Sequence, residues 1–148
     1  MKISNRLTGT LVILGMLVSV GSIWASGATF AITGQGIVLG AEKEGEDGVS
    51  RIRTTAVVGK AFTLVAQGLA LPRGGKPQPT EPEAGAWKFD AKHFKQLEPV
   101  GKPGDKTQVA IRLEPLVAGP ARIRFTGKVL GYERQVEVQV EVTASKRD

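Results

Sequence analysis

The only histidine of the chain, His93, lies in the segment GAWKFDAKHF, residues 85–94, together with one of the two tryptophans. A metal site needs several converging ligands, and the chain has no cysteine and no second histidine to supply them. Nucleophilic catalysis would need an activated serine or threonine next to His93 and an acid that orients the ring, and no hydroxyl stands in such a motif. We therefore expect no catalytic residue, no metal and no cofactor, and a protein that is not an enzyme.

Other patterns resemble ligand sites only in composition. The run EKEGEDG, residues 42–48, is acidic, but it lacks the alternating oxygen ligands and the distant closing glutamate of a calcium loop. The pieces GQG at 34–36 and RGGK at 73–76 lack the strand-to-helix context of a phosphate-binding loop. We expect a solvated loop and turns here, and no small-molecule substrate.

Packing in a core explains the aromatic residues of segment 85–94 better than a catalytic or metal site does. Trp87 and Phe89 are separated by one residue, so on a strand they point to the same face. A tryptophan in the core of a β-sandwich buries a large apolar area and fixes how the sheets pack. We expect both rings in the core.

The distribution of basic residues indicates which classes of partner the protein could bind. The 148-residue chain has a net charge of +6, and its basic residues are spread among acids and apolar residues. This distribution predicts a solvated charged surface, not the basic stripe with stacking aromatics of a nucleic-acid binder. A mildly basic surface also suits acidic lipids or an acidic protein. The basic positions considered are Arg51, Arg53, Lys88, Lys92, Lys95, Arg122 and Arg124. We expect no nucleic-acid partner.

The last third of the chain alternates apolar and polar residues with a strict period of two. Each such run predicts a strand with one buried and one solvated face. The apolar positions are Val109, Ile111 and Leu113, then Ala121, Ile123 and Phe125, then Val136, Val138, Val140 and Val142. Several short strands with no amphipathic helix between them indicate stacked antiparallel sheets. Over residues 50–148 we therefore expect an all-β sandwich.

Glycine and proline divide the rest of the chain. Residues 29–49 are expected to be a tether, with a first edge strand in its apolar part and then an acidic loop. Residues 92–100 predict a strand or one short turn of helix. The proline-rich segment LPRGGKPQPTEPEAGA, residues 71–86, predicts a long exposed loop outside any sheet.

The strand pattern resembles a bacterial immunoglobulin-like domain. The resemblance rests on VVGKAFTL, a lone tryptophan on a middle strand, the Val-x-Ile-x-Leu and Ala-x-Ile-x-Phe pair, and a closing Val-x-Val-x-Val strand, within residues 50–143. It implies an immunoglobulin-like antiparallel β-sandwich in which Trp87 is the buried tryptophan. GAW and AGPARIRF also resemble segments of chagasin-type cysteine protease inhibitors. The inhibitory Asn-Pro-Thr-Thr-Gly and Arg-Pro-Trp loops are missing, so that activity does not carry over.

Residues 1–28 predict an export or anchoring segment. A basic N-terminus precedes an apolar centre, and small residues follow at 25–28, which is the pattern of a bacterial export signal. The 19 residues from Leu7 to Ala25 carry no charge and are long enough to cross a bilayer as one helix. Trp24 would then lie at the outer membrane interface. Retention as a signal anchor and cleavage near Ala28 both fit, and the anchor is our first expectation.

One turn is a candidate contact surface. Val129, Leu130 and Tyr132 lie in GKVLGYE, residues 127–133, where a hairpin tip is expected. Apolar residues exposed at such a tip often mark a contact surface, although Leu130 would equally well cap the end of the sandwich. The proline-rich loop is either a second interaction arm or a passive surface loop.

Together these features predict a non-catalytic accessory or scaffolding subunit of a bacterial membrane complex. One helix, residues 7–25, would cross the inner membrane, and the sandwich would brace the complex on the periplasmic face. Its partners would be the other subunits of the complex and the bilayer, and an energy-transducing complex is one host that fits. The alternative is a cleaved, secreted or periplasmic binding module, either adhesin-like or inhibitor-like.

Overall fold

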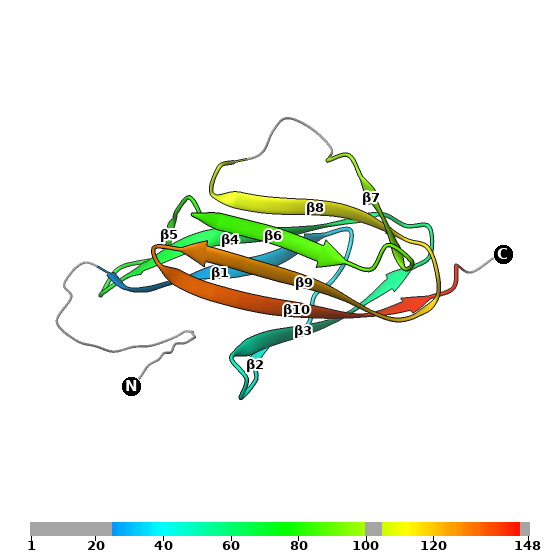
Figure 1. Ribbon diagram of the computed structural model, residues 1–148, viewed down its shortest axis with the longest axis horizontal. Helices are drawn as coiled ribbons and strands as arrows, with labels where there is room; N and C mark the ends of the chain where they lie inside the picture. Colours follow the sequence, from blue (N-terminus) through cyan, green and yellow to red (C-terminus); the bar gives the residue numbers. More distant parts are fainter. Residues whose placement is uncertain (1–24, 100–104, 146–148) are drawn as a thin grey trace.

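The computed structural model describes residues 25–99 and 105–145 (Figure 1). The expected anchor helix over residues 7–25, apart from Ala25, and its interface residue Trp24 lie outside this part of the chain. Among the described residues, no helix is long and apolar enough to span a bilayer. Every regular element in the two ranges is a strand.

The longer strands run roughly along the long axis of the molecule (Figure 1). Their bounds are β1 Ala25–Gln35, β2 Lys43–Glu44, β3 Val49–Val57, β4 Phe62–Pro72, β5 Gln78–Pro79, β6 Ala84–Phe89, β7 Phe94–Leu97, β8 Gln108–Pro115, β9 Gly119–Val129 and β10 Tyr132–Thr143. One sheet has the order β1-β4-β8-β7, with β5 added beside β4, and the other has the order β2-β3-β10-β9-β6. Neighbouring strands are antiparallel except β3 and β10, which run parallel.

The predicted alternation is confirmed in the last three strands. Ile111 and Leu113 of β8 are buried, as are Ala121, Ile123 and Phe125 of β9 and the four predicted valines of β10. The apolar faces of the two sheets meet in two core clusters, and in one of them Phe30 of β1 and Phe125 of β9 pack edge to face with 4.8 Å between ring centroids. A Cβ added to Gly127 would lie 2.6 Å from Cζ of Phe30, so this glycine makes room for the ring.

Trp87 and Phe89 pack against the core as expected, although both stay partly exposed. The Trp87 ring lies 4.9 Å from that of Phe125. Its indole Nε1–H donates a 2.9 Å hydrogen bond to the carbonyl oxygen of Val109. Because β6 and β8 belong to different sheets, this single bond ties the two layers together.

The proline-rich segment 71–86 is not one long loop. β4 continues to Pro72, β5 forms at Gln78–Pro79, and β6 begins at Ala84. Pro79 pairs with Leu69 on a strand that has a neighbour on one side only, where the missing proline N–H breaks no ladder. The prolines are tolerated because they lie at strand ends and at a sheet edge, and the exposed loop shrinks to the residues between these strands.

The sandwich begins well before residue 50, where it was expected to begin. β1 begins at Ala25, and its residues pair with β4 as far as Gln35. Ala28 and Phe30 are buried, so this part of the chain belongs to the core. The apolar part of residues 29–49 lies in the edge strand β1, and the following residues add β2 to the other sheet. The segment 92–100 contains a strand, β7, rather than a helical turn.

The strand order is that of an immunoglobulin-like sandwich. In that fold, strands A, B, E and D form one sheet and strands C, F and G form the other. The order β1-β4-β8-β7 matches the first sheet, and β6-β9-β10 matches the second, with β3 added in parallel beside β10. Trp87 lies on β6, which takes the place of the strand that carries the buried tryptophan of that fold.

Candidate interaction surfaces

The β9–β10 hairpin ends in a two-residue turn with an unusual residue in it. Val129 pairs with Tyr132, and the turn residues Leu130 and Gly131 have φ angles of 50° and 83°. Two-residue hairpin turns with positive φ at both positions favour Asn-Gly, because a bulky side chain is strained there. Leu130 is the only described residue other than glycine with a positive φ. A leucine at this position is therefore less favourable for the stability of the turn than asparagine or glycine would be.

The exposure of the three predicted contact residues differs. Leu130 and Tyr132 are 49% and 50% exposed, so the hairpin tip presents apolar surface to solvent. Val129 is 0% exposed and packs in the core. It does not belong to the contact surface predicted from the sequence, because strand alternation turns it inward while the turn carries its neighbour outward.

The tip is held in place by the segment before β6. The Gly131 N–H donates a 2.6 Å hydrogen bond to Oε1 of Glu83, and the Glu83 N–H donates a 2.8 Å bond to the carbonyl oxygen of Lys128. These two bonds connect the proline-rich segment to the hairpin. The exposed Leu130 and Tyr132 thus lie on a braced turn.

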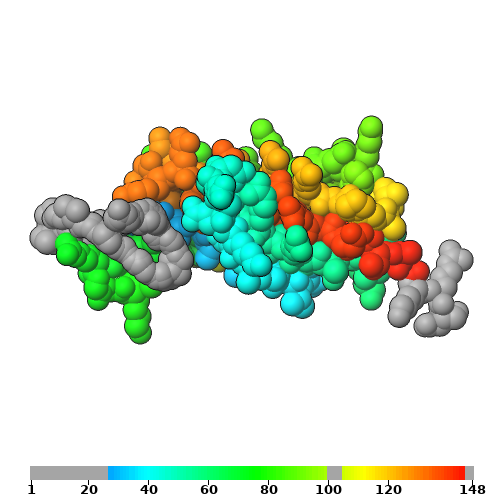
Figure 2. All heavy atoms as spheres, turned by 90° about the horizontal axis from the view of Figure 1, so that it is seen from below, coloured from blue at the N-terminus to red at the C-terminus, as the bar shows by residue number. Residues whose placement is uncertain are grey.

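The structure brings together basic residues that are scattered in the sequence. The outward positions of β3, β9 and β6 alternate with the buried ones, and their side chains share the outer face of one sheet. We call this surface the basic face, and it consists of Lys43, Arg51, Arg53, Lys88, Arg122 and Arg124 around Glu137. Figure 2 shows, from below, the cyan and teal residues of β2 and β3 beside the red β10. The expectation of scattered charge is therefore wrong for these residues.

The strand register places the basic face in two rows. In the first row, Lys43 lies opposite Arg51, and Arg51 and Arg124 lie on either side of Glu137. Lys88 completes it on the far side of Arg124. In the second row, listed by strand from β3 to β9, are Arg53, Gln139 and Arg122.

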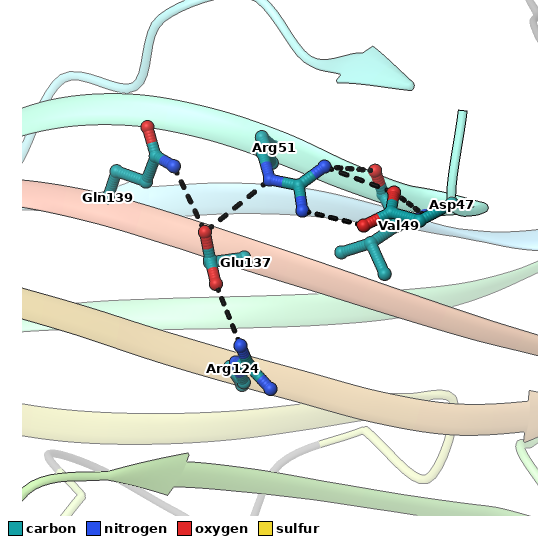
Figure 3. Close-up of polar contacts among 6 residues, drawn as sticks. All are labelled: Asp47, Val49, Arg51, Arg124, Glu137 and Gln139. Atoms are coloured by element: carbon teal, nitrogen blue, oxygen red, sulfur yellow. Dashed lines mark hydrogen bonds and ion pairs between the residues drawn. The ribbon is translucent and has the colours of Figure 1, made fainter. Parts of the chain in front are cut away.

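Glu137 is the centre of the first row (Figure 3). It is 3% exposed although it lies on the outer face. Its carboxylate accepts a 3.0 Å hydrogen bond from Nε2 of Gln139 and a 3.2 Å bond from Nη2 of Arg124, and it lies 3.5 Å from Nε of Arg51. The bond from Gln139 and then the Arg124 guanidinium lower the pKa of Glu137, against the opposing effect of burial. The group is therefore a carboxylate at neutral pH.

Arg51 has a second carboxylate on its other side (Figure 3). Its two terminal nitrogens donate to the two oxygens of Asp47 at 2.8 and 3.1 Å. This pairing, followed by the N–H of Val49, lowers the pKa of the Asp47 carboxyl to about 2. Arg51 is thus held in one orientation by groups on both sides.

A shallow groove lies between the β2 segment and this face. It is lined by Gly40, Ala41, Lys43, Glu44, Gly45, Arg51, Arg53 and Gln139. Three of the lining side chains are cationic and one is anionic. Guanidinium groups form bidentate hydrogen bonds with carboxylates and phosphates. The basic face can therefore bind anionic groups.

Two further candidates from the sequence are His93 and the acidic run 42–48. His93 stands in the turn before β7, with its Nδ1 3.4 Å from Oδ2 of Asp90. Among the described residues, no group of three potential metal ligands comes together. The acidic run is not purely a solvated loop. Glu42 pairs with Arg134 at 2.7 Å, and Asp47 pairs with Arg51.

Sequence reasoning missed the basic face and the buried Glu137. One signal was available, because Arg51 and Arg53, like Arg122 and Arg124, are two positions apart and so share a face within each strand. Their alignment across strands depends on the parallel pairing of β3 with β10, which no local pattern encodes.

Comparison with known proteins adds little to this description. No family model matches the chain, and no curated protein matches it. Among solved structures, a chimeric titin Z1Z2 carrying a decorin peptide is similar over 82% of this chain and 98% of its own, at 11% identity and a TM-score of 0.43. A titin M10–obscurin-like 1 Ig complex is similar over 82% of this chain and 100% of its own, at 11% identity and a TM-score of 0.41. The strand order alone assigns the immunoglobulin-like fold, and bacterial origin and the chagasin-type resemblance stay predictions.

Proposed function

We propose that the protein is a non-catalytic accessory subunit, anchored in a bacterial inner membrane by residues 7–25, whose immunoglobulin-like domain braces a membrane complex on the periplasmic face. The observation that carries this proposal is where the hairpin tip lies. Figure 1 shows the start of β1 and the β9–β10 turn at the same end of the molecule. Because the proposed anchor, residues 7–25, ends where β1 begins, it would hold this end against the bilayer surface.

The strained turn supports the same proposal. A leucine at positive φ costs folding free energy, about 1–3 kcal/mol for such backbone conformations, and its side chain is half exposed. Strain of this kind persists where the residue serves a contact. Leu130 and Tyr132 would meet the membrane-proximal part of a neighbouring subunit.

The anchor is tested by the mass and N-terminal sequence of the mature protein from gently solubilised membranes. We expect an intact Met1 and co-migration with a larger complex. A new N-terminus near residue 28, with the protein in the soluble fraction, would reject the proposal.

The contact is tested by the double variant Leu130→Asn, Tyr132→Ser in the full chain. We expect this variant to remain in the membrane but to lose co-migration with the complex. The control is Leu116→Asn, an apolar residue that is 42% exposed in the β8–β9 connection. This connection lies at the opposite end of the sandwich from the β9–β10 turn (Figure 1). Equal loss in the control, or no loss in the double variant, would contradict the assigned contact.

A cleaved, secreted binding module is the second candidate. The small residues at 25–28 suit signal peptidase. Cleavage after Ala28 would leave Thr29–Gln35 to pair with β4, so the sandwich would keep most of its first strand. The N-terminal sequence of the mature protein separates the two candidates directly.

A further inference from the structure

We propose that the basic face binds an acidic surface of a partner protein, through carboxylates that pair with its arginines. The six cations of this face surround two acidic residues of the same outer surface, Glu137 and Glu141, and two more, Asp47 and Glu44, lie at its β2 edge. Glu137 pairs with Arg51 and Arg124, and Asp47 also pairs with Arg51, whereas no ion pair among the described residues involves the other four cations. Six cations against four carboxylates leave the face with a net positive charge.

The cations of the second row are available to a ligand. Arg53 and Arg122 are exposed, and no carboxylate of the described chain lies within ion-pair distance of either. Arg51 and Arg124 are different, because Glu137 orients them from below and they keep exposed fractions of 37% and 63%. Two oriented and two free guanidinium groups thus face the same side.

The dimensions suit a protein surface rather than a small ion. Strands are about 4.8 Å apart, so the row from Lys43 to Lys88 across five strands spans about 19 Å. The two rows are about 7 Å apart along the strands. A partner that matches this face needs several carboxylates spread over a comparable area, as on an acidic protein surface.

Other occupants fit the face less well. A single-stranded nucleic acid would need aromatic side chains for stacking, and Trp87 and Phe89 pack against the core. A second copy would meet the same positive charge with its own face, which is repulsive. The strands run along the molecule (Figure 1), so a sandwich anchored by its end would turn this face sideways, away from the bilayer. The orientation of the face relative to the bilayer, and the position of the partner beside the anchor, rest on the proposed function. The binding chemistry of the face does not.

The test uses the full chain in a neutral detergent and poly-L-glutamate as the probe. We expect salt-sensitive binding that the double variant Arg53→Gln, Arg122→Gln weakens about tenfold, since it removes two exposed ion pairs. The matched control, Lys92→Gln, Lys95→Gln, removes the same charge from exposed residues near β7 of the other sheet. We expect it to change binding by less than about twofold. Tryptophan fluorescence checks that both variants are folded.

The binding results distinguish an acidic protein partner from an anionic membrane or a nucleic acid. Absence of binding to poly-L-glutamate, or equal weakening in both double variants, would overturn the proposal. So would a selective loss, in Arg53→Gln, Arg122→Gln, of binding to phosphatidylglycerol vesicles or to a single-stranded DNA oligonucleotide without a matching loss for poly-L-glutamate. Because the assay does not depend on how the N-terminus is processed, a failed anchor and a failed basic face give different results.

Discussion

Replacing Glu137 with glutamine tests whether the carboxylate holds the basic face together. The change keeps the shape of the side chain and removes its charge, so Arg51 and Arg124 lose their shared counterion. The affected contacts are the 3.2 Å hydrogen bond from Arg124 and the 3.5 Å ion pair with Arg51. We expect Glu137→Gln to lower the free energy of unfolding.

The size of the stability loss depends on the burial of Glu137 and on the exposure of the two arginines that pair with it. A hydrogen bond to a charged group contributes about 1.5–3 kcal/mol, and breaking a fully buried ion pair costs about 3–5 kcal/mol. Glu137 is buried, but the arginine side chains are 37% and 63% exposed, so water screens their repulsion after the substitution. We expect a loss of about 2 kcal/mol at neutral pH.

The effect depends on pH in a direction fixed by the pKa of Glu137. That pKa is lowered from its ordinary value of 4.5 in the folded protein, so the folded state binds this proton less readily than the unfolded state. The contribution to stability is fully present above pH 4.5 and is lost as the pH falls through the lowered pKa. The difference between the wild type and Glu137→Gln should therefore shrink below pH 4.5.

The assay is urea unfolding of the full chain in mild detergent, followed by tryptophan fluorescence at neutral and acidic pH. The control is Glu141→Gln, on the same strand and face but exposed, for which we expect a change below about 0.5 kcal/mol. If Glu137→Gln matches this control, or is more stable than the wild type, the carboxylate does not hold the arginines. A difference that stays constant with pH would also refute the reasoning.

The remaining predictions concern the core and the turn. Gly127→Ala should cost about 1–3 kcal/mol, because the new Cβ would lie 2.6 Å from Phe30, and urea unfolding measures it. Trp87→Phe should cost about 1–2 kcal/mol, because Val109 loses the 2.9 Å hydrogen bond that joins the sheets, and thermal unfolding measures it. Leu130→Asn should raise stability by up to about 1 kcal/mol, because asparagine tolerates positive φ better than leucine, even as it weakens the proposed contact.

Each of these has an outcome that contradicts it. Gly27→Ala serves as the control for the glycine, because a Cβ there would meet nothing within 4 Å, and equal losses would remove the steric explanation. An unchanged melting temperature in Trp87→Phe would show that the bond between the sheets contributes nothing. If Leu130→Asn is less stable than the wild type, the leucine stabilises the fold and the argument from strain fails.

The sequence by itself determined which residues face the core. Period-two alternation predicted the buried sides of β8, β9 and β10, because side chains on a strand alternate between faces whatever the strand pairs with. The same rule predicted the inward direction of Trp87 and Phe89. The two-layer architecture followed, since strands with one apolar face must bury it against another sheet.

Only the tertiary structure decided what the outward faces do. The basic face exists because β3 pairs in parallel with β10 in a register that places Arg51 beside Glu137. Register is a property of two strands distant in sequence, so the alternation within each strand does not reveal it. The prolines of 71–86 likewise lie at strand ends and at a sheet edge. Leu130 has a positive φ because it lies in a two-residue turn. Local pattern assigned each side chain to a face, and long-range pairing decided which neighbours it met there.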